Sequence, residues 1–239
     1  MRAVPPLRSW PAAARRLTKW PPVGGVRFGS LRRVTPISEE FGYDRGLPID
    51  RYYIERFLGE HAGAIRGRVL EVGDSAYTTQ FGGDGAVEHV DILDVREDNP
   101  RATVVGDLTD PERFPAQAFD CVICTQTLPY IYDVHAAVRT LHRLLRPGGT
   151  VLATVTSVSR IWTKGDRLYG DYWRFTSRSS RLLFEQVFDP EEVAVTSYGN
   201  VLAATSFLYG LATSELRPKE LDYNDPDVPL LIGIKARKA

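Results

Sequence analysis

Short apolar runs recur through the middle of the chain, and each one ends on an acidic, polar or glycine residue. Runs of this length are typical of strands that are buried on both faces of a parallel sheet. In an open α/β sheet, ligands bind outside the carboxyl ends of the strands. We therefore expect the residues that close the runs to form the rim of a ligand site. The runs lie at residues 67–72, 87–90, 103–105, 119–124 and 150–156, and two further strands are expected near 192–196 and 228–234.

Helical patterns separate or follow these runs. A helix is predicted at about residues 50–61, with Asp50 as its N-cap. Another helix precedes the Pro-Gly-Gly turn at residues 147–149, and a third is predicted to begin at Thr176 or Ser177. The nearly all-apolar segment 200–211 is expected to form a buried helix.

The first two runs carry the signs of a nucleotide site. Gly73 follows the first strand, where a residue without a side chain lets the backbone pass close to a ligand. Asp91 lies twenty residues after Glu71, at the end of the second run. An acid at about this interval is placed to accept hydrogen bonds from the hydroxyls of a ribose. An ordinary buried strand and turn would also explain residues 67–74, so that segment alone leaves both interpretations open.

A helix end, the turn Pro147-Gly148-Gly149 and a strand follow one another at residues 144–152. Together with residues 69–73, Asp91, Gly106-Asp107 and 119–122, this segment resembles the class I S-adenosylmethionine-dependent methyltransferases, in particular type-11-like domains. The resemblance covers residues 65–157. It implies an α/β fold: a Rossmann-like, seven-stranded, mostly parallel sheet with an antiparallel last strand and helices on both faces.

The resemblance implies S-adenosylmethionine as the cofactor. Glu71 and Asp91 would hold its amino-acid and ribose ends, and Asp107 would meet the adenine amino group. Gln126 would lie near the methyl group. The full set of residues implied to bind the cofactor is Glu71, Gly73, Asp74, Ser75, Asp91, Asp107 and Gln126.

The loop after the first strand departs from the family's Gly-x-Gly-x-Gly. It keeps only the first glycine, Gly73, and carries Tyr77 where the family has no side chain. A non-catalytic, methyltransferase-like binding module therefore stays open as an alternative. A dinucleotide-dependent oxidoreductase would need Gly-x-Gly-x-x-Gly, and this chain has Ser75 and Thr78 in place of the second and third glycines.

Acceptor residues are expected on either side of the cofactor cleft, because aromatic and charged side chains suit a planar ring, a sugar or an acidic group. They are Tyr43, Arg45, Arg51, Tyr52, Tyr130, Trp173 and Arg174. The candidate general bases are Asp133, His135 and Asp171. In the alternative interpretation, Trp173 fills the core and Asp171 forms an internal ion pair with Arg174. The predicted activity is methyl transfer to a hydroxyl of a small-molecule or glycan acceptor.

Charge narrows the range of partners. The 239 residues include 30 basic and 30 acidic side chains, so the formal net charge of zero argues against a general nucleic-acid binder. Residues 1–35 carry eight basic residues and no acid, and we predict a Pro-rich arm there with a short helix from Ser9. Residues 36–239 are predicted to be the methyltransferase domain, with a cofactor core at about 65–157 and a substrate-side region at 158–239.

Cys121 and Cys124 are the only cysteines. The Cys-x-x-Cys spacing occurs in redox and metal pairs. Residues three apart on a strand face opposite sides, however, so we expect two buried structural thiols in a reducing, cytoplasmic compartment. No His, Asp or Glu cluster has the spacing of metal ligands, so no metal is expected. No stretch is long enough to span a membrane, and the oligomeric state stays open.

Overall fold

A computed structural model describes residues 20–22, 25–162 and 170–239 of the chain. It divides into two compact units, Met1–Pro36 and Ile37–Ala239. The described part of the first unit contains one short 3-10 turn, η1 (Gly29–Leu31). The helix predicted from Ser9 lies outside the described residues. Among those residues, no helix is both long enough and apolar enough to cross a membrane.

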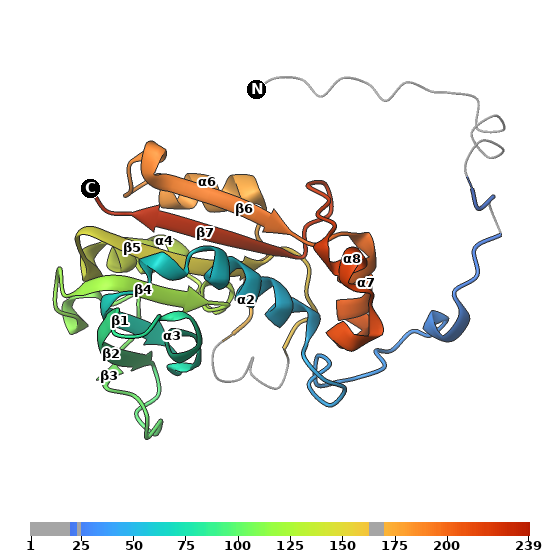
Figure 1. Cartoon of the computed structure of the whole chain (residues 1–239), viewed down its shortest axis with the longest axis horizontal. Helices are drawn as coiled ribbons and strands as arrows, with labels where there is room; N and C mark the ends of the chain where they lie inside the picture. The colour runs from blue at the N-terminus through green and yellow to red at the C-terminus, as the bar shows by residue number, and fades with distance from the viewer. Residues whose placement is uncertain (1–19, 23–24, 163–169) are drawn as a thin grey trace. The chain divides into compact units, whose positions relative to one another are not determined.

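The second unit is built on a seven-stranded sheet with the order β3-β2-β1-β4-β5-β7-β6, which runs from the bottom to the top of Figure 1. Strands β1 to β5 are parallel, and β7 lies antiparallel between β5 and β6. The predicted fold is therefore confirmed. The strands are β1 (Gly67–Val72), β2 (Val87–Asp94), β3 (Val104–Val105), β4 (Phe119–Thr125), β5 (Leu145–Thr156), β6 (Val193–Tyr198) and β7 (Leu231–Arg237).

Helices cover both faces of this sheet. Figure 1 shows α2 crossing in front of the strands, with α4 and α6 behind them. The helices are α2 (Ile49–Glu60), α3 (Ala76–Phe81), α4 (Val134–Leu144), α6 (Ser177–Phe184), α7 (Val201–Tyr209) and α8 (Pro218–Asp222). Five 3-10 turns complete the described part of this unit: η2 (Ala62–Ala64), η3 (Pro111–Arg113), η4 (Leu128–Tyr130), η5 (Pro190–Glu192) and η6 (Thr213–Glu215).

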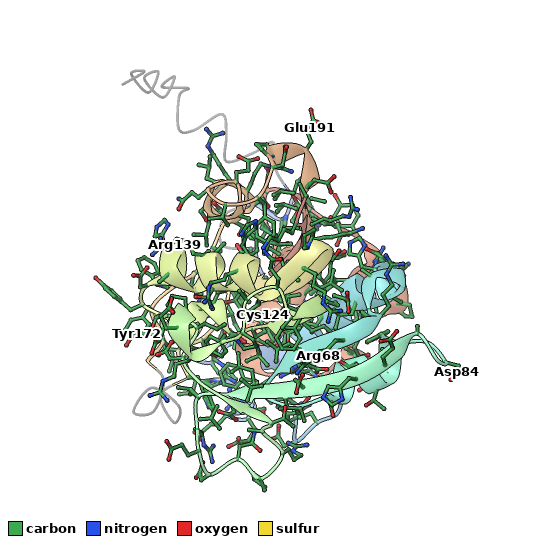
Figure 2. The ribbon with its side chains drawn as sticks, turned by 90° about the vertical axis from the view of Figure 1, so that its left-hand side faces the viewer. Arg68, Asp84, Cys124, Arg139, Tyr172 and Glu191 are labelled. Carbon is green, nitrogen blue, oxygen red and sulfur yellow. The ribbon has the colours of Figure 1, made fainter. Side chains whose placement is uncertain are left out.

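The alternation of side chains along β4 creates two separate cores. Cys124 packs in the core that includes α4 and α6, whereas Cys121 packs in the core that includes α2 and α7. Both thiols are free and buried, as predicted, and burial raises the pKa of each to about 12. Figure 2 shows Cys124 near the middle of the molecule.

Three predicted details of the elements are wrong. Helix α2 is capped by Pro48, so Asp50 lies inside its first turn. Strand β2 continues past Asp91 to Asp94, because an ion pair with Arg68 on the neighbouring strand lets a charged residue stay within the sheet. Helix α7 buries only one side, and it exposes Val201, Leu202 and Leu208.

Candidate functional site

Two adjoining cavities open at the carboxyl ends of the parallel strands, with volumes of about 360 Å³ and 490 Å³. Both lie within the size range of small-molecule and cofactor sites, roughly 300–1,000 Å³. They share part of their walls. The shared lining residues are Val72, Gly73, Thr125, Gln126, Tyr130 and Trp162.

The carboxyl end of β2 contributes Asp94 to the wall of the first cavity. Its carboxylate accepts hydrogen bonds from Arg96 N (2.9 Å) and from Asn99 Nδ2 (2.7 Å). The same Asn99 nitrogen lies 3.2 Å from the carbonyl oxygen of Gly73, which it also contacts as a donor. Asn99 therefore fixes Asp94 relative to the end of β1.

Beyond β3, the first cavity is lined by Gly106, Asp107 and Leu108. Gly106 has no room for a side chain, since a Cβ there would lie 2.7 Å from the ring of Phe114. Asp107 accepts a hydrogen bond from Thr109 N at 2.8 Å. A carboxylate held in this way beside a buried leucine can accept hydrogen bonds next to an apolar surface, which suits one edge of a planar ring.

The second cavity begins at Glu71, which is buried at the end of β1. Its carboxylate accepts hydrogen bonds from Tyr77 N (3.1 Å), Thr78 N (2.7 Å) and Thr78 Oγ1 (2.6 Å). Burial raises the pKa of Glu71, although these hydrogen bonds act in the opposite direction. Glu71 therefore fixes the first turn of α3 below the cavity.

The loop between β1 and α3 keeps an open space despite its missing glycines. Gly73 has φ +93°, in the left-handed region that favours glycine, and a Cβ there would meet no heavy atom within 4 Å. The side chain of Tyr77 is directed to α2, where its hydroxyl accepts a hydrogen bond of 2.6 Å from Arg51 Nη1. Arg51 Nε also donates to the hydroxyl of Tyr43 at 2.8 Å.

The two cavities meet at Gln126, directly after β4. Gln126 has φ +50°, which is uncommon for a residue other than glycine, and its backbone nitrogen donates to Thr154 O at 2.9 Å. Its side-chain nitrogen Nε2 is buried and has no hydrogen-bond partner within the described residues. Strained backbone and unpaired buried donors concentrate at functional sites.

Residues 62–153 match the family model described as a methyltransferase domain. The matched residues lie in the second unit, Ile37–Ala239, and we name this unit the methyltransferase domain after this similarity. A search of curated proteins finds no significant match.

Solved structures with a similar fold share little sequence with the methyltransferase domain. A SAM-dependent methyltransferase from Archaeoglobus fulgidus superposes with a TM-score of 0.52 at 10% identity, covering 79% of this chain and 94% of the other. The N-methyltransferase NodS from Bradyrhizobium japonicum, in complex with S-adenosyl-L-homocysteine, gives 0.50 at 14% identity, covering 84% and 94%. The [4+2]-cyclase SpnF gives 0.51 at 14% identity, covering 78% and 80%.

Of the residues implied to bind S-adenosylmethionine, five line the cavities of the methyltransferase domain: Glu71, Gly73, Asp74, Asp107 and Gln126. Ser75 precedes α3 and lines neither cavity. Asp91 lies within β2, away from the rim, where Arg68 Nε (2.8 Å) and Thr103 Oγ1 (3.0 Å) donate to its carboxylate. The apolar run resumes after Asp91 and ends at Asp94, a signal in the sequence that would have located the rim acid.

The expected acceptor residues separate into two groups. Tyr43, Arg51 and Tyr130 line the second cavity. Arg45, by contrast, forms an ion pair with Glu215, and Tyr52 donates a hydrogen bond of 2.6 Å to Asp222. Neither of these two side chains lines a cavity.

The three candidate bases of the methyltransferase domain all have structural partners outside the cavities. Asp133 caps α4 by accepting a hydrogen bond from Ala136 N at 2.9 Å. His135 is exposed and contacts Gln186 at 2.8 Å. Asp171 forms an ion pair with Arg174, the arrangement that the alternative interpretation described.

The Asp171–Arg174 pair supports one wall of the cavities. Asp171 also accepts a hydrogen bond of 3.1 Å from the backbone nitrogen of Trp162, which lines both cavities. Arg174 Nη2 donates to the carbonyl of Arg160 at 2.8 Å. Burial acts to raise the pKa of Asp171, but the hydrogen bonds from Arg174 and Trp162 hold it below its ordinary value.

Trp173 lies outside both cavities, in a group of exposed aromatic rings. Its ring stacks on Tyr132 at a centroid distance of 6.0 Å, and Tyr132 also contacts Tyr172 edge-on. The indole nitrogen of Trp173 donates to the carbonyls of Ile131 and Tyr132 at 3.1 and 3.2 Å. Trp173 is 38% exposed and lines neither cavity, so it is neither a full core residue nor a wall of these cavities.

Proposed function

We propose that this protein transfers the methyl group of S-adenosylmethionine to a hydroxyl of a small-molecule or glycan acceptor. The observation that carries the proposal is the junction of the two cavities at Gly73, Gln126 and Tyr130. A methyl group in transit must be reachable from the cofactor on one side and from the acceptor on the other. Two cavities that share these walls provide such a point.

The first cavity suits the nucleoside end of the cofactor. Asp94 closes β2 and carries free carboxylate capacity for ribose hydroxyls, because each carboxylate oxygen accepts more than one hydrogen bond. In our proposal Asp94 takes the ribose role first expected for Asp91. Asp107 would bind the polar edge of the adenine ring, and Leu108 would contact its apolar face.

The second cavity suits the amino-acid end of the cofactor and the acceptor. Gly73 leaves open space beside the backbone, and the guanidinium of Arg51 lines the same cavity. An arginine held by two tyrosine hydroxyls is well oriented to bind a carboxylate. Four aromatic residues complete the wall and would enclose a planar ring or a sugar: Phe41, Tyr130, Trp162 and Phe207.

The chemistry needed from the protein is modest. S-adenosylmethionine supplies an activated methyl group, so the residues must align the acceptor oxygen and exclude water. The unpaired Nε2 of Gln126 is placed to donate a hydrogen bond at the junction of the cavities. Among the described residues, no group of three or more His, Cys, Asp or Glu could hold a metal ion.

The alternative function is a non-catalytic binding module. Such a module would bind the cofactor at the same site but would not transfer its methyl group. Calorimetry with S-adenosylmethionine and S-adenosylhomocysteine tests the site first. Transfer is then tested by incubating the protein with methyl-labelled cofactor and a panel of sugars, phenols, amines and thiols. Binding of both cofactor forms with label moving to a hydroxyl supports the proposal. Binding without transfer to any acceptor favours the binding module, and no binding rejects both.

A further inference from the structure

Four carboxylates line the second cavity: Glu40, Asp50, Glu71 and Asp74. Glu71 accepts three hydrogen bonds from the first turn of α3, and Asp74 accepts one from Ala76 N at 2.9 Å within its own loop. Glu40 is exposed, and its charge acts on Arg160. These three acids therefore already interact with other groups of the protein near the edge of the cavity.

Asp50 differs from the other three. It lies in the first turn of α2, and its carboxylate receives backbone hydrogen bonds from Arg51 N at 2.9 Å and from its own amide. The guanidinium of the adjacent Arg51 is directed to the hydroxyls of Tyr43 and Tyr77, and the two side chains form no ion pair within 4.0 Å. The carboxylate of Asp50 thus keeps most of its hydrogen-bonding capacity for a ligand.

The surroundings of Asp50 join the cofactor loop to the end of β4. Its charge acts on Tyr77, which follows the loop after β1, and on Tyr130, which lines both cavities. Asp50 lines the second cavity together with both of these tyrosines. In contrast, Asp133, His135 and Asp171 line neither cavity.

We propose that Asp50 is the general base that accepts the proton of the acceptor hydroxyl during methyl transfer. The inference rests on the proposed function. In this step the acceptor oxygen bonds to the methyl carbon, and the bond from that carbon to sulfur breaks with its electron pair staying on sulfur. The hydroxyl proton passes to the carboxylate of Asp50, which later releases it to water.

The environment of Asp50 fits a base better than that of an exposed aspartate. Burial raises the pKa of Asp50, and the opposing influence of Arg51 is the smaller one. A carboxylate with a raised pKa binds a proton more strongly, which makes it a more effective base for a weakly acidic hydroxyl. The aromatic wall formed by Tyr130 and Phe207 keeps part of the same cavity apolar.

The position of Asp50 can be tested by binding alone, with two cofactor analogues. S-adenosylhomocysteine lacks the methyl group, whereas sinefungin carries a protonated amino group on the carbon that replaces the methylated sulfur. If Asp50 faces the transferred methyl, its carboxylate will bind that ammonium group. We expect wild-type protein to bind sinefungin about 10-fold or more tighter than S-adenosylhomocysteine, the scale of a charge-assisted hydrogen bond.

The substitution Asp50→Asn should remove this preference and leave the dissociation constant for S-adenosylhomocysteine within about twofold of wild type. The control Asp84→Asn removes the same charge at a different place. Figure 2 shows Asp84 and Tyr172 at opposite edges of the molecule. This variant should keep the preference for sinefungin. A preference that survives in Asp50→Asn would overturn the inference. Equal weakening of both analogues would also overturn it, because Asp50 would then hold the amino group that they share. Failure of wild-type protein to bind S-adenosylhomocysteine would instead reject the proposed function.

Discussion

The guanidinium of Arg51 donates a hydrogen bond of 2.6 Å to the hydroxyl of Tyr77, and this contact joins the first turn of α2 to the segment after β1. Burial acts to lower the pKa of Arg51, but Asp50 and the tyrosines Tyr77 and Tyr43 hold it above its ordinary value. Arg51 therefore stays charged inside the cavity. Tyr77, which interrupts the expected glycine pattern, therefore orients the positively charged side chain of Arg51.

We predict that Arg51→Gln weakens binding of S-adenosylhomocysteine by about 1.5–3 kcal/mol, the range for a hydrogen bond to a charged group. The loss should be confined to ligands with the amino-acid group, so binding of 5′-methylthioadenosine should not change. Calorimetry with both ligands measures the difference. The control is Arg56→Gln on the same helix, where the side chain pairs with Glu60 and Asp222 outside the cavities. An equal loss for both ligands would contradict the assignment.

The ribose role of Asp94 gives a second prediction. We expect Asp94→Ala to weaken S-adenosylhomocysteine and 5′-methylthioadenosine alike, by about 1.5–3 kcal/mol, because both ligands carry the ribose. Asp98→Ala is the matched control, since Asp98 is exposed and its partner is Arg96. The assignment fails if Asp94→Ala binds 5′-methylthioadenosine as tightly as wild type.

Asp91 should matter for stability and not for binding. Burial acts to raise the pKa of Asp91, but hydrogen bonds from Arg68 and Thr103 outweigh it and hold the pKa below its ordinary value. A carboxyl with a lowered folded-state pKa stabilises the fold above its unfolded pKa of about 3.9, and this contribution is lost as the pH falls through the lowered value.

We therefore expect Asp91→Asn to lower the free energy of unfolding by about 1–3 kcal/mol near neutral pH, with a smaller difference from wild type in acid. Affinity for S-adenosylhomocysteine should hold. Urea unfolding near pH 7 and near pH 3 measures both free energies. A deficit that is the same at the two pH values would show that the ionised carboxylate is not the source of the stability.

Trp173 lines neither cavity, and we expect it to affect methyl transfer by holding Ile131, a lining residue of the first cavity whose carbonyl accepts a hydrogen bond from the indole nitrogen. Because its ring is partly exposed, Trp173→Ala should lower the free energy of unfolding by about 1–3 kcal/mol, less than the 3–5 kcal/mol of a fully buried aromatic residue. Affinity for S-adenosylhomocysteine should not change, whereas methyl transfer to an identified acceptor should fall. Tyr223→Ala, at another exposed ring, is the control for thermal melts and titrations. Unimpaired transfer by Trp173→Ala would contradict this role.

The sequence predicted the layers of the fold well, because apolar runs are local signals. The predicted Pro-Gly-Gly turn, however, lies within β5, which begins at Leu145. The sequence did not show which of Asp91 and Asp94 lies at the end of β2. Asp91 interrupts the apolar run and Asp94 ends it, and only the ion pair with Arg68 keeps Asp91 inside the sheet. The capping role of Asp133 was equally hidden, because it depends on where α4 begins. The ion pair of Asp171 with Arg174, in contrast, was anticipated in the alternative interpretation of that segment.

Asp50 was expected only as a helix cap for a related reason. A helix that begins one or two residues earlier than predicted changes which side chain points into the cavity. Pro48 takes the cap position in the structure, so Asp50 moves into the first turn and lines the cavity. Tyr77 likewise acquires its role from Arg51, a residue that precedes it by 26 positions.

The two thiols of β4 provide a natural pair of reporters for unfolding. Cys121 is covered by one helical layer and Cys124 by the other, and neither sulfur is accessible or ionised near neutral pH in the folded state. A brief pulse of an alkylating reagent would therefore label each cysteine only when its own layer opens. Mass spectrometry of the two peptides would reveal whether the faces of the sheet separate together or in sequence, without any introduced label.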